Sequence, residues 1–441
     1  MNIYNRLIGI ILKSYGYDIN KSLNHLRYLK ALSENLFWDE QSKKRDKIIN
    51  HHISHTTWYR NFIDPDKKND WSMIPILTKS DLQIYSSQYN HSVLHNYRYY
   101  SSNTSGSSGN PLHFIKNKYC HSLAWAKILT SYAALNISQY DKEARFFGHV
   151  KGERLTLLYE NIKDIFLNRK RLDIFNLSDD NFQIMINHLI KNKFDYIYGY
   201  TNVIRELSKY ILQNGLSPLK EYCSTLKSCI VTAEMCYDID RDMIERALGI
   251  PVYIEYGCSE TSIIAIDNRD KKLGISTDRI WVEIVDDNNK LLEYGNVGKI
   301  IITDLYNEIF PIIRYEIGDY GSIERSDKYP YLFLKNLVGR ISDMILLPSG
   351  RKAPGLTFYY ISRSIIEKSD AIKEFRIIQK SLDTFVFQIV GTQNIDYSLR
   401  KQIFIETEKY LEPGLTIKFE ICDSIQNKYS DKIQHFFSEI N

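Results

Sequence analysis

Residues 99–111 read Tyr99-Tyr100-Ser101-Ser102-Asn103-Thr104-Ser105-Gly106-Ser107-Ser108-Gly109-Asn110-Pro111, in a chain that has only 20 glycines among 441 residues. Glycine lets backbone amides approach an anion closely, and serine and threonine hydroxyls add hydrogen-bond donors without bulk. The spacing is not that of a Walker A loop, because no Lys-Ser/Thr pair follows Gly109. The stretch therefore predicts a polyphosphate-binding loop, although its composition alone fits a flexible polar linker equally well.

A second cluster begins as a strand and breaks into a loop that carries a carboxylate. It reads Tyr253-Ile254-Glu255-Tyr256-Gly257-Cys258-Ser259-Glu260-Thr261, with the break expected at Gly257. Strand ends are where α/β folds place their ligands. Glu260 can hold Mg²⁺, which takes oxygen ligands and shares them with phosphates, and Tyr256 can stack on a base. Taken alone, the cluster fits a plain turn with an exposed glutamate better.

Two later clusters offer groups for the sugar and phosphates of a nucleotide. Asp319 lies between two glycines in Phe310–Gly321 and can accept hydrogen bonds from two ribose hydroxyls, or it can mark a hairpin turn. Arg340, in Gly339–Ile345, is a planar cation that suits phosphate or ribose oxygens.

Hydrophobic periodicity predicts an α/β protein with two domains. From about 98 to 325, short strands such as Ser228–Thr232 and Val252–Tyr256 alternate with amphipathic helices such as Asp238–Leu248, and a run of strands follows from 280. The last hundred residues form a small α+β pattern with strands at Phe375–Gln379, Phe385–Val390 and Thr416–Ile421 and helices near 356–367 and 396–411. We expect a large N-terminal domain over 1–340, with mixed sheets and flanking helices, and a small C-terminal domain over 341–441.

Composition excludes several classes of protein. The 57 basic and 53 acidic residues leave a net charge of +4, too little to argue for nucleic acid or an anionic membrane as a partner. Six cysteines without a CxxC pair predict reduced thiols and neither a disulfide framework nor a zinc site. No segment approaches the roughly 20 apolar residues of a membrane span, and the N-terminus lacks the features of a signal peptide. A cytoplasmic location follows by default.

The order and spacing of the four clusters resemble the adenylate-forming superfamily. The closest likeness is to its phenylacetate–CoA ligase-like branch, which includes adenylating proteins of capsular-polysaccharide clusters. Thr104–Pro111 looks like that family's Thr-Ser-Gly-Thr-Thr-Gly-x-Pro loop, and Thr232–Met235 looks like its Gly-Ala-Glu-Pro segment with both outer positions changed. Pro311–Asp319 and Gly339–Ile345 match its Arg-Tyr-x-x-Gly-Asp and Gly-Arg-x-x-Asp-Met segments.

The resemblance implies a two-step reaction in which a carboxylate attacks ATP to give an acyl-adenylate and pyrophosphate, and a thiol or an amine then takes the acyl group. The cofactors implied are ATP and Mg²⁺, with CoA as one of the acceptors left open beside a carrier-protein thiol and an amine on a sugar or amino acid. The other expected partners are the carboxylic acid itself and, left open, a second copy of the chain in a homodimer. The small domain is expected to be mobile, swinging about a hinge near Asp343.

The resemblance also assigns roles to residues. The residues expected to bind the β- and γ-phosphates are Thr104, Ser105, Gly106, Ser107, Ser108 and Gly109. Those expected to bind the rest of the nucleotide are Ala233, Glu234, Tyr256, Gly257, Ser259, Asp319 and Arg340. Glu260 is expected to bind Mg²⁺ and to take part in catalysis, and the acyl pocket is expected to be lined by Phe147, His149, Tyr198 and Gly199. Packing against the sheet is the commoner role for tyrosines such as Tyr198.

The family places its catalytic lysine on a C-terminal loop, and the candidate in this chain is Lys432. Its surroundings depart from the family, which usually has glycine before the lysine and often arginine after it, where this chain has Asp431 and His435. Asp431 can hold Lys432 in an unproductive ion pair, Lys428 is a competing candidate, and a plain surface lysine is a further alternative. These departures support a second hypothesis, a catalytically silent relative that binds nucleotide or acyl-adenylate as a sensor or scaffold.

Overall fold

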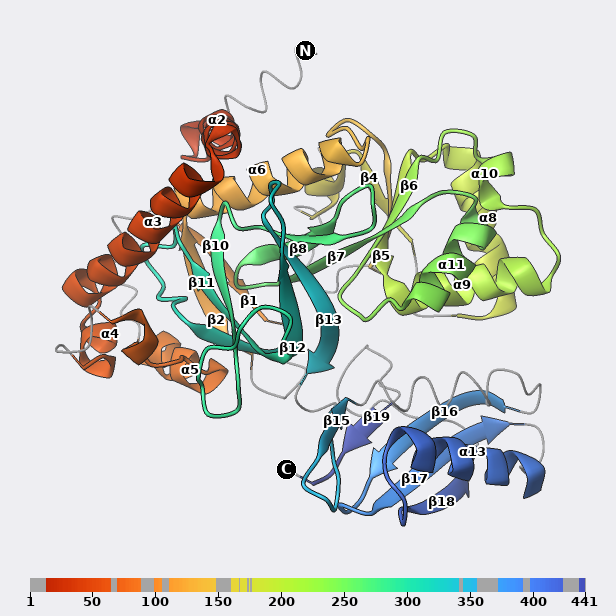
Figure 1. Ribbon diagram of the computed structural model, residues 1–441. Coiled ribbons are helices and arrows are strands. Elements are labelled where there is room, and N and C mark those ends of the chain that lie inside the picture. The colour runs from red at the N-terminus through yellow and green to blue at the C-terminus, as the bar shows by residue number, and fades with distance from the viewer. Residues whose placement is uncertain are drawn as a thin grey trace.

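The computed structural model describes most of the chain. The described residues are 13–64, 70–88, 99–104, 111–147, 160–165, 167–172, 174, 177–340, 344–354, 372–391, 397–422 and 436–440. Their strands form one large sheet, two small hairpins and a four-stranded C-terminal sheet (Figure 1). Mixed sheets flanked by helices confirm the predicted α/β class.

The large sheet has 11 strands in two halves that meet at β7. One half is parallel and runs β4 (Arg169–Arg171), β3 (Glu143–Phe146), β5 (Tyr196–Tyr200), β6 (Ser228–Thr232) and β7 (Val252–Cys258). The other half is antiparallel and runs β8 (Ser262–Asp267), β9 (Leu273–Ile275), β13 (Leu332–Arg340), β12 (Tyr315–Arg325), β11 (Gly298–Asp304) and β10 (Ile280–Val285).

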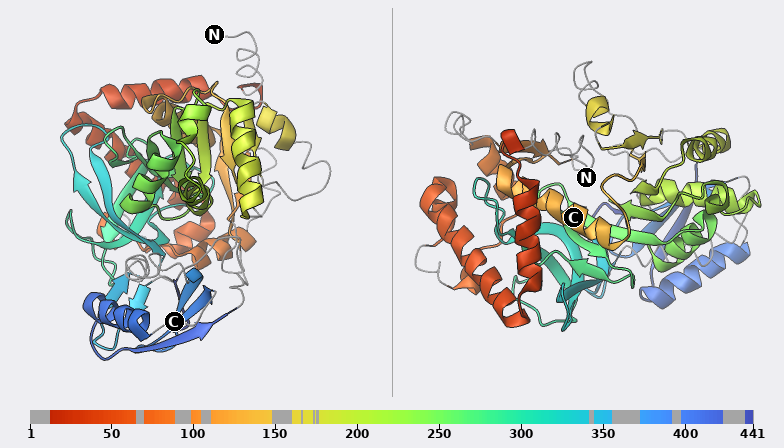
Figure 2. Two further views of the ribbon diagram at one scale, coloured as in Figure 1. Left: turned by 90° about the vertical axis from the view of Figure 1, so that its right-hand side faces the viewer. Right: turned by 90° about the horizontal axis from the view of Figure 1, so that it is seen from above.

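Side-chain alternation along the parallel strands feeds two different layers of helices. On β5, Ile197 packs with α8 (Asp179–Asn192), α9 (Thr201–Gln213), α10 (Leu219–Tyr222) and α11 (Asp238–Leu248). Tyr196 and Tyr198 face the opposite layer, where α6 (Lys118–Ala134) contributes Ile128 and Tyr132. The two helical layers lie on opposite faces of the sheet (Figures 1 and 2).

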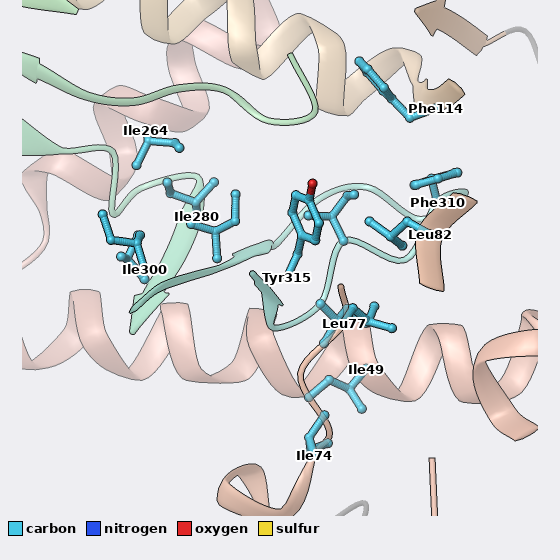
Figure 3. Close-up of a cluster of buried hydrophobic side chains, with 14 of the residues drawn as sticks. Ile49, Ile74, Leu77, Leu82, Phe114, Ile264, Ile280, Ile300, Phe310 and Tyr315 are labelled. Carbon is cyan, nitrogen blue, oxygen red and sulfur yellow. The ribbon is translucent and has the colours of Figure 1, made fainter. Parts of the chain in front are cut away.

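The antiparallel half packs against an extensive hydrophobic core, part of which Figure 3 shows in close-up. A separate hairpin of β1 (Tyr99–Asn103) and β2 (His113–Asn117) adds Phe114 to this core. The N-terminal helices are α2 (Ile19–Ala31), α3 (Glu34–His55), α4 (Thr57–Phe62), η2 (Trp71–Met73) and α5 (Lys79–Gln88), and Ile49 of α3 and Leu82 of α5 reach the same core. Thr78 caps α5, because Thr78 and Asp81 exchange side-chain to backbone hydrogen bonds.

The C-terminal strands build a core of their own. The sheet order is β18 (Thr416–Ile421), β17 (Thr384–Gly391), β16 (Ile372–Gln379) and β19 (Phe436–Ser438), covered by α13 (Tyr397–Tyr410), and the small hairpin β14 (Met344–Leu346) and β15 (Lys352–Pro354) adds Ile345 to that core. The predicted boundary at 340/341 adjoins residues 341–343, which lie outside the described residues together with the predicted hinge near Asp343 and the helix expected at 356–367. The boundary and the hinge stay predictions.

Two local expectations are wrong. β7 does not break at Gly257 but continues to Cys258, with a register shift between Tyr256 and Gly257. β12 runs from Tyr315 to Arg325, so Asp319 lies inside a strand and the alternative of a hairpin turn at Asp319 is wrong. None of the helices in the described part of the chain is long and apolar enough to cross a membrane.

Candidate active site

The base of the predicted phosphate loop is closed by two hydrogen bonds. The Thr104 amide donates to the Leu112 carbonyl over 3.0 Å, and the Leu112 amide donates to the Thr104 hydroxyl over 2.9 Å. Leu112 itself is fully buried. The two ends of the loop therefore meet at the tip of the β1–β2 hairpin, while residues 105–110, which include Ser105, Gly106, Ser107, Ser108 and Gly109, lie outside the described residues.

Glu260 occupies the tight turn that joins β7 to β8. It is 5% exposed, so the alternative of an exposed glutamate is wrong. The Tyr315 hydroxyl donates a 3.0 Å hydrogen bond to the Glu260 carboxylate. Figure 3 shows the Tyr315 ring in the core, with its hydroxyl directed away from Leu77. One carboxylate oxygen of Glu260 is thus positioned by a buried phenol.

Two buried cations hold the backbone on either side of Glu260. Lys116, on β2, donates from Nζ to the Ser259 carbonyl over 3.1 Å, and the Arg279 guanidinium donates to the Thr261 carbonyl. Arg279 is fully buried and pairs with Asp304 over 3.4 Å. Burial lowers the pKa of the Lys116 ammonium. We call this arrangement the Glu260 turn, residues 259–261 with Lys116 and Arg279; it joins the phosphate-loop hairpin to the predicted metal ligand.

A further hydrogen bond joins β7 to β12 across the curved sheet. The Tyr256 hydroxyl donates to Oδ2 of Asp319 over 2.7 Å. Asp319 follows Gly318, whose φ of +88° is a conformation that favours glycine. In the pairing of β12 with β13, the Cα atoms of Asp319 and Arg340 are partners. The two predicted ribose contacts therefore lie opposite each other on neighbouring strands.

Gly257 and Cys258 have packing roles in this turn. A Cβ on Gly257 would lie 2.5 Å from the Ser262 carbonyl oxygen, so only glycine lets the two strands approach this closely. Burial raises the pKa of the Cys258 thiol to about 12, so this cysteine is a poor nucleophile.

Ala233 and Glu234 follow β6 directly, where α/β folds leave space for ligands. Ala233 is exposed and has a φ of +66°. The Glu234 carboxylate accepts a hydrogen bond from the Asn202 amide over 2.8 Å, which caps the N-terminus of α9. The Glu234 backbone carbonyl also accepts a hydrogen bond, from the Thr201 hydroxyl over 3.1 Å.

Three of the four residues predicted for the acyl pocket are described, and they lie together. The rings of Phe147 and Tyr198 stack with centroids 5.2 Å apart and an interplanar angle of 10°. A Cβ on Gly199 would lie 2.4 Å from Cβ of Phe146, so this glycine allows β3 and β5 to pair closely. His149 lies outside the described residues.

The donor set suits Mg²⁺ better than a metal held by protein ligands alone. Among the described residues no group of three or more His, Cys, Asp or Glu side chains gathers to bind a metal. Mg²⁺ keeps several waters and binds through one or two carboxylates together with substrate phosphates, so Glu260 beside a phosphate loop fits it.

Comparisons with known proteins show what this chain is similar to. Residues 355–439 match the model of the CapK C-terminal domain. Protein CapK of Staphylococcus aureus is 25% identical to this chain over 266 residues, which cover 59% of this chain and 56% of CapK. Phenylacetate-coenzyme A ligase of Pseudomonas putida is 23% identical over 237 residues, which cover 52% of this chain and 53% of that ligase. The chain thus matches about half the length of each curated relative.

The solved structure of 2-hydroxyisobutyryl-CoA ligase with 2-HIB-AMP superposes with a TM-score of 0.71, covering 93% of this chain and 91% of that one at 16% identity. The chain has the adenylate-forming fold and is related to CapK. The CapK-like match includes the C-terminal segment that carries Lys432, which itself lies outside the described residues.

Sequence reasoning missed the roles of three residues in this part of the fold. Lys116 and Arg279 stand in strands or turns without any motif around them, so no sequence signal marks them. Glu255 was quoted within its cluster but given no role, although a carboxylate inside the apolar run Val252–Tyr256 was a usable signal.

Proposed function

We propose that this protein is an ATP-dependent, AMP-forming ligase that converts a carboxylic acid into an acyl-adenylate and pyrophosphate. The observation that carries the proposal is the convergence of sequence-distant residues at one place: Lys116 on Ser259, Tyr315 on Glu260 and Tyr256 on Asp319. The adenylate-forming fold supports it.

Each residue would act on charge or position. The first step brings a carboxylate to a polyphosphate, so negative charge must be neutralised around the reacting phosphorus. The loop at 104–109 would bind the β- and γ-phosphates and Asp319 the ribose hydroxyls, while Ala233 and Tyr256 would flank the base. Glu260 would hold Mg²⁺, which supplies charge neutralisation on the phosphates. Lys432 would place its positive charge near the transition state, and Arg340 would bind the ribose together with Asp319.

The acceptor of the second step is a thiol or an amine in this proposal. Phenylacetate-coenzyme A ligase, by its name, uses the thiol of coenzyme A, which supports the thiol. The resemblance of the motifs to adenylating proteins of capsular-polysaccharide clusters keeps an amine on a sugar as the alternative acceptor. We place the reaction in the cytoplasm, where ATP is available and the six free cysteines would stay reduced.

The sequence around Lys432 supports a second candidate, a nucleotide- or acyl-adenylate-binding relative without turnover, because Asp431 adjoins the lysine. The test of the proposal is pyrophosphate release from ATP and Mg²⁺ over a panel of carboxylic acids, with Lys432→Ala as the matched variant. Release that depends on one acid and is lost in the variant supports the ligase. A folded protein that binds ATP and releases no pyrophosphate with any acid supports the silent relative.

A further inference from the structure

A carboxylate that the proposed reaction does not use lies on the opposite face of β7 from Tyr256. Glu255 accepts hydrogen bonds from the Tyr132 hydroxyl over 2.8 Å and from the Tyr198 hydroxyl over 2.9 Å, one on each carboxylate oxygen. Its side chain is therefore enclosed by α6 on one side and β5 on the other. Tyr198 also stacks on Phe147, so Glu255 lies directly behind the predicted acyl-binding aromatics.

The charged neighbours of Glu255 are Glu143 and Arg145. Glu143 and Arg145 form their own ion pair over 2.5 Å, and Tyr196 donates its hydroxyl to the other oxygen of Glu143. In the described part of the chain, no lysine or arginine forms an ion pair with Glu255. The cation of this group is Arg145, whose ion pair is with Glu143 and whose guanidinium also lies over the rings of Tyr198 and Phe147. Burial raises the pKa of the Glu255 carboxyl, and the two tyrosine hydrogen bonds and the Arg145 guanidinium oppose that shift only in part.

The cluster is nevertheless reachable. Tyr132, Arg145, Tyr198 and Glu255 are each only half-buried, whereas their neighbours Glu143 and Tyr196 are buried. Glu255 also has acceptor capacity left, because a carboxylate has about four lone-pair sites and two are in use. A further donor can therefore bind Glu255 without displacing either tyrosine.

We propose that Glu255 selects a carboxylic acid that carries a protonated amine, and that Tyr132 and Tyr198 hold its carboxylate to receive that ammonium group. The inference rests on the proposed ligase function and names its substrate class. An apolar tail would leave the buried charge without a partner, and a hydroxyl would satisfy a hydrogen bond but not the charge. An ammonium group supplies three donors and one positive charge.

The test compares pairs of acids that differ in one group. Each straight-chain ω-amino acid of a graded series is paired with the acid that carries a methyl group in place of the ammonium and with the acid that carries a hydroxyl. Pyrophosphate release and acid binding by calorimetry are both measured on the wild-type chain. Selection of the acid can then be judged from binding even if no pyrophosphate is released. Hydrogen bonds to charged groups contribute about 1.5–3 kcal/mol, which corresponds to a preference of roughly 10- to 100-fold for the amino acid.

The matched variants are Glu255→Gln, which keeps the shape and removes the charge, and Glu245→Gln, which changes a carboxylate on α11 that accepts from the Val252 amide and Lys271. We expect the preference to be lost in Glu255→Gln and kept in Glu245→Gln. A wild-type preference for the methyl acid, or a preference that Glu255→Gln leaves unchanged, overturns the inference, and the wild-type comparison decides it even if the variant fails to fold. Selective binding of amino acids without any pyrophosphate release would overturn the ligase function and keep the inference.

Discussion

Two glutamates five positions apart on one hairpin differ in what surrounds them. Glu260, in the turn, accepts from Tyr315 while Lys116 and Arg279 bind the carbonyls on either side of it. Glu255, on the strand, accepts from two tyrosines and forms no ion pair with a described lysine or arginine, although the Arg145 guanidinium lies over the ring of Tyr198. The first setting fixes a carboxylate among positive charges, which suits a metal–polyphosphate site. The second leaves a carboxylate in need of a cation, which suits recognition of a substrate.

The strongest way to break this comparison is to neutralise Glu260. We expect Glu260→Gln to lower the rate of pyrophosphate formation by about 10²–10³-fold, a loss typical of removing one group that stabilises transition-state charge. Unfolding by denaturant should change little, because Gln can still accept from Tyr315. If Glu260→Gln kept most of the wild-type rate while Glu255→Gln abolished it with every acid, the roles of the two carboxylates would be reversed.

The next largest effect concerns the support of the Glu260 turn. Arg279→Met leaves Asp304 buried without its ion pair, so we expect the free energy of unfolding to fall by about 3–5 kcal/mol. The control is Arg269→Met, an exposed arginine that donates to the Ala134 carbonyl and should cost far less. Equal urea midpoints for the two variants would mean that the buried pair does not hold the turn.

A smaller effect is expected where β7 meets β12. Tyr256→Phe removes the hydrogen bond that holds Asp319 in position. A hydrogen bond contributes about 1 kcal/mol net, so we expect the variant to bind ATP roughly fivefold more weakly. Titration calorimetry with a non-hydrolysable ATP analogue measures this, and Tyr320→Phe, whose hydroxyl contacts Asp287 at an exposed site, is the control. Unchanged affinity in Tyr256→Phe would remove Asp319 and Tyr256 from the nucleotide site.

The smallest expected effect is a pH dependence of the free energy of unfolding that comes from Glu255. Because burial raises the folded-state pKa of Glu255, the folded protein binds a proton that the unfolded chain releases at pH values just above the ordinary carboxyl pKa. Stability contributed by this group is therefore present at lower pH and is lost as pH rises through the folded pKa. Urea unfolding of wild type and Glu255→Gln is compared from pH 4 to 7. The stability of the wild type relative to the variant should fall as pH rises, and a constant stability difference would contradict this prediction.

Much of this organisation could be predicted from sequence, because local patterns specify local structure. The helix Asp238–Leu248 and the strand Ser228–Thr232 have the predicted bounds, and the predicted run of strands begins at Ile280. The grouping of Thr104, Glu260 and Asp319 into one site followed from the resemblance of ordered motifs, and those site roles remain predictions. Lys116 and Arg279 escaped prediction because their contacts form only in the folded chain. Lys116 binds the Ser259 carbonyl, 143 residues away in the sequence, and Arg279 binds the Thr261 carbonyl, 18 residues away.

The extension of β12 through Asp319 was also missed, for a physical reason. Gly318 and Gly321 favour a turn by local propensity, but pairing of β12 with both β11 and β13 overrides it. Gly318 supplies the positive φ at a register irregularity, and Gly321 lies between the side chains of Ile300 and Leu334. Tertiary pairing thus decided the structure where the local signal pointed to a hairpin.

The central claim is that the Glu260 turn belongs to an adenylation site. The most direct measurement is acid-dependent exchange of radiolabelled pyrophosphate into ATP, compared between the wild-type chain and Glu260→Gln. The account predicts exchange that requires both Mg²⁺ and a carboxylic acid in the wild type and is at least about a hundredfold slower in the variant. Exchange that proceeds equally in both proteins, or none with any acid from a folded wild-type chain that binds ATP, would contradict it.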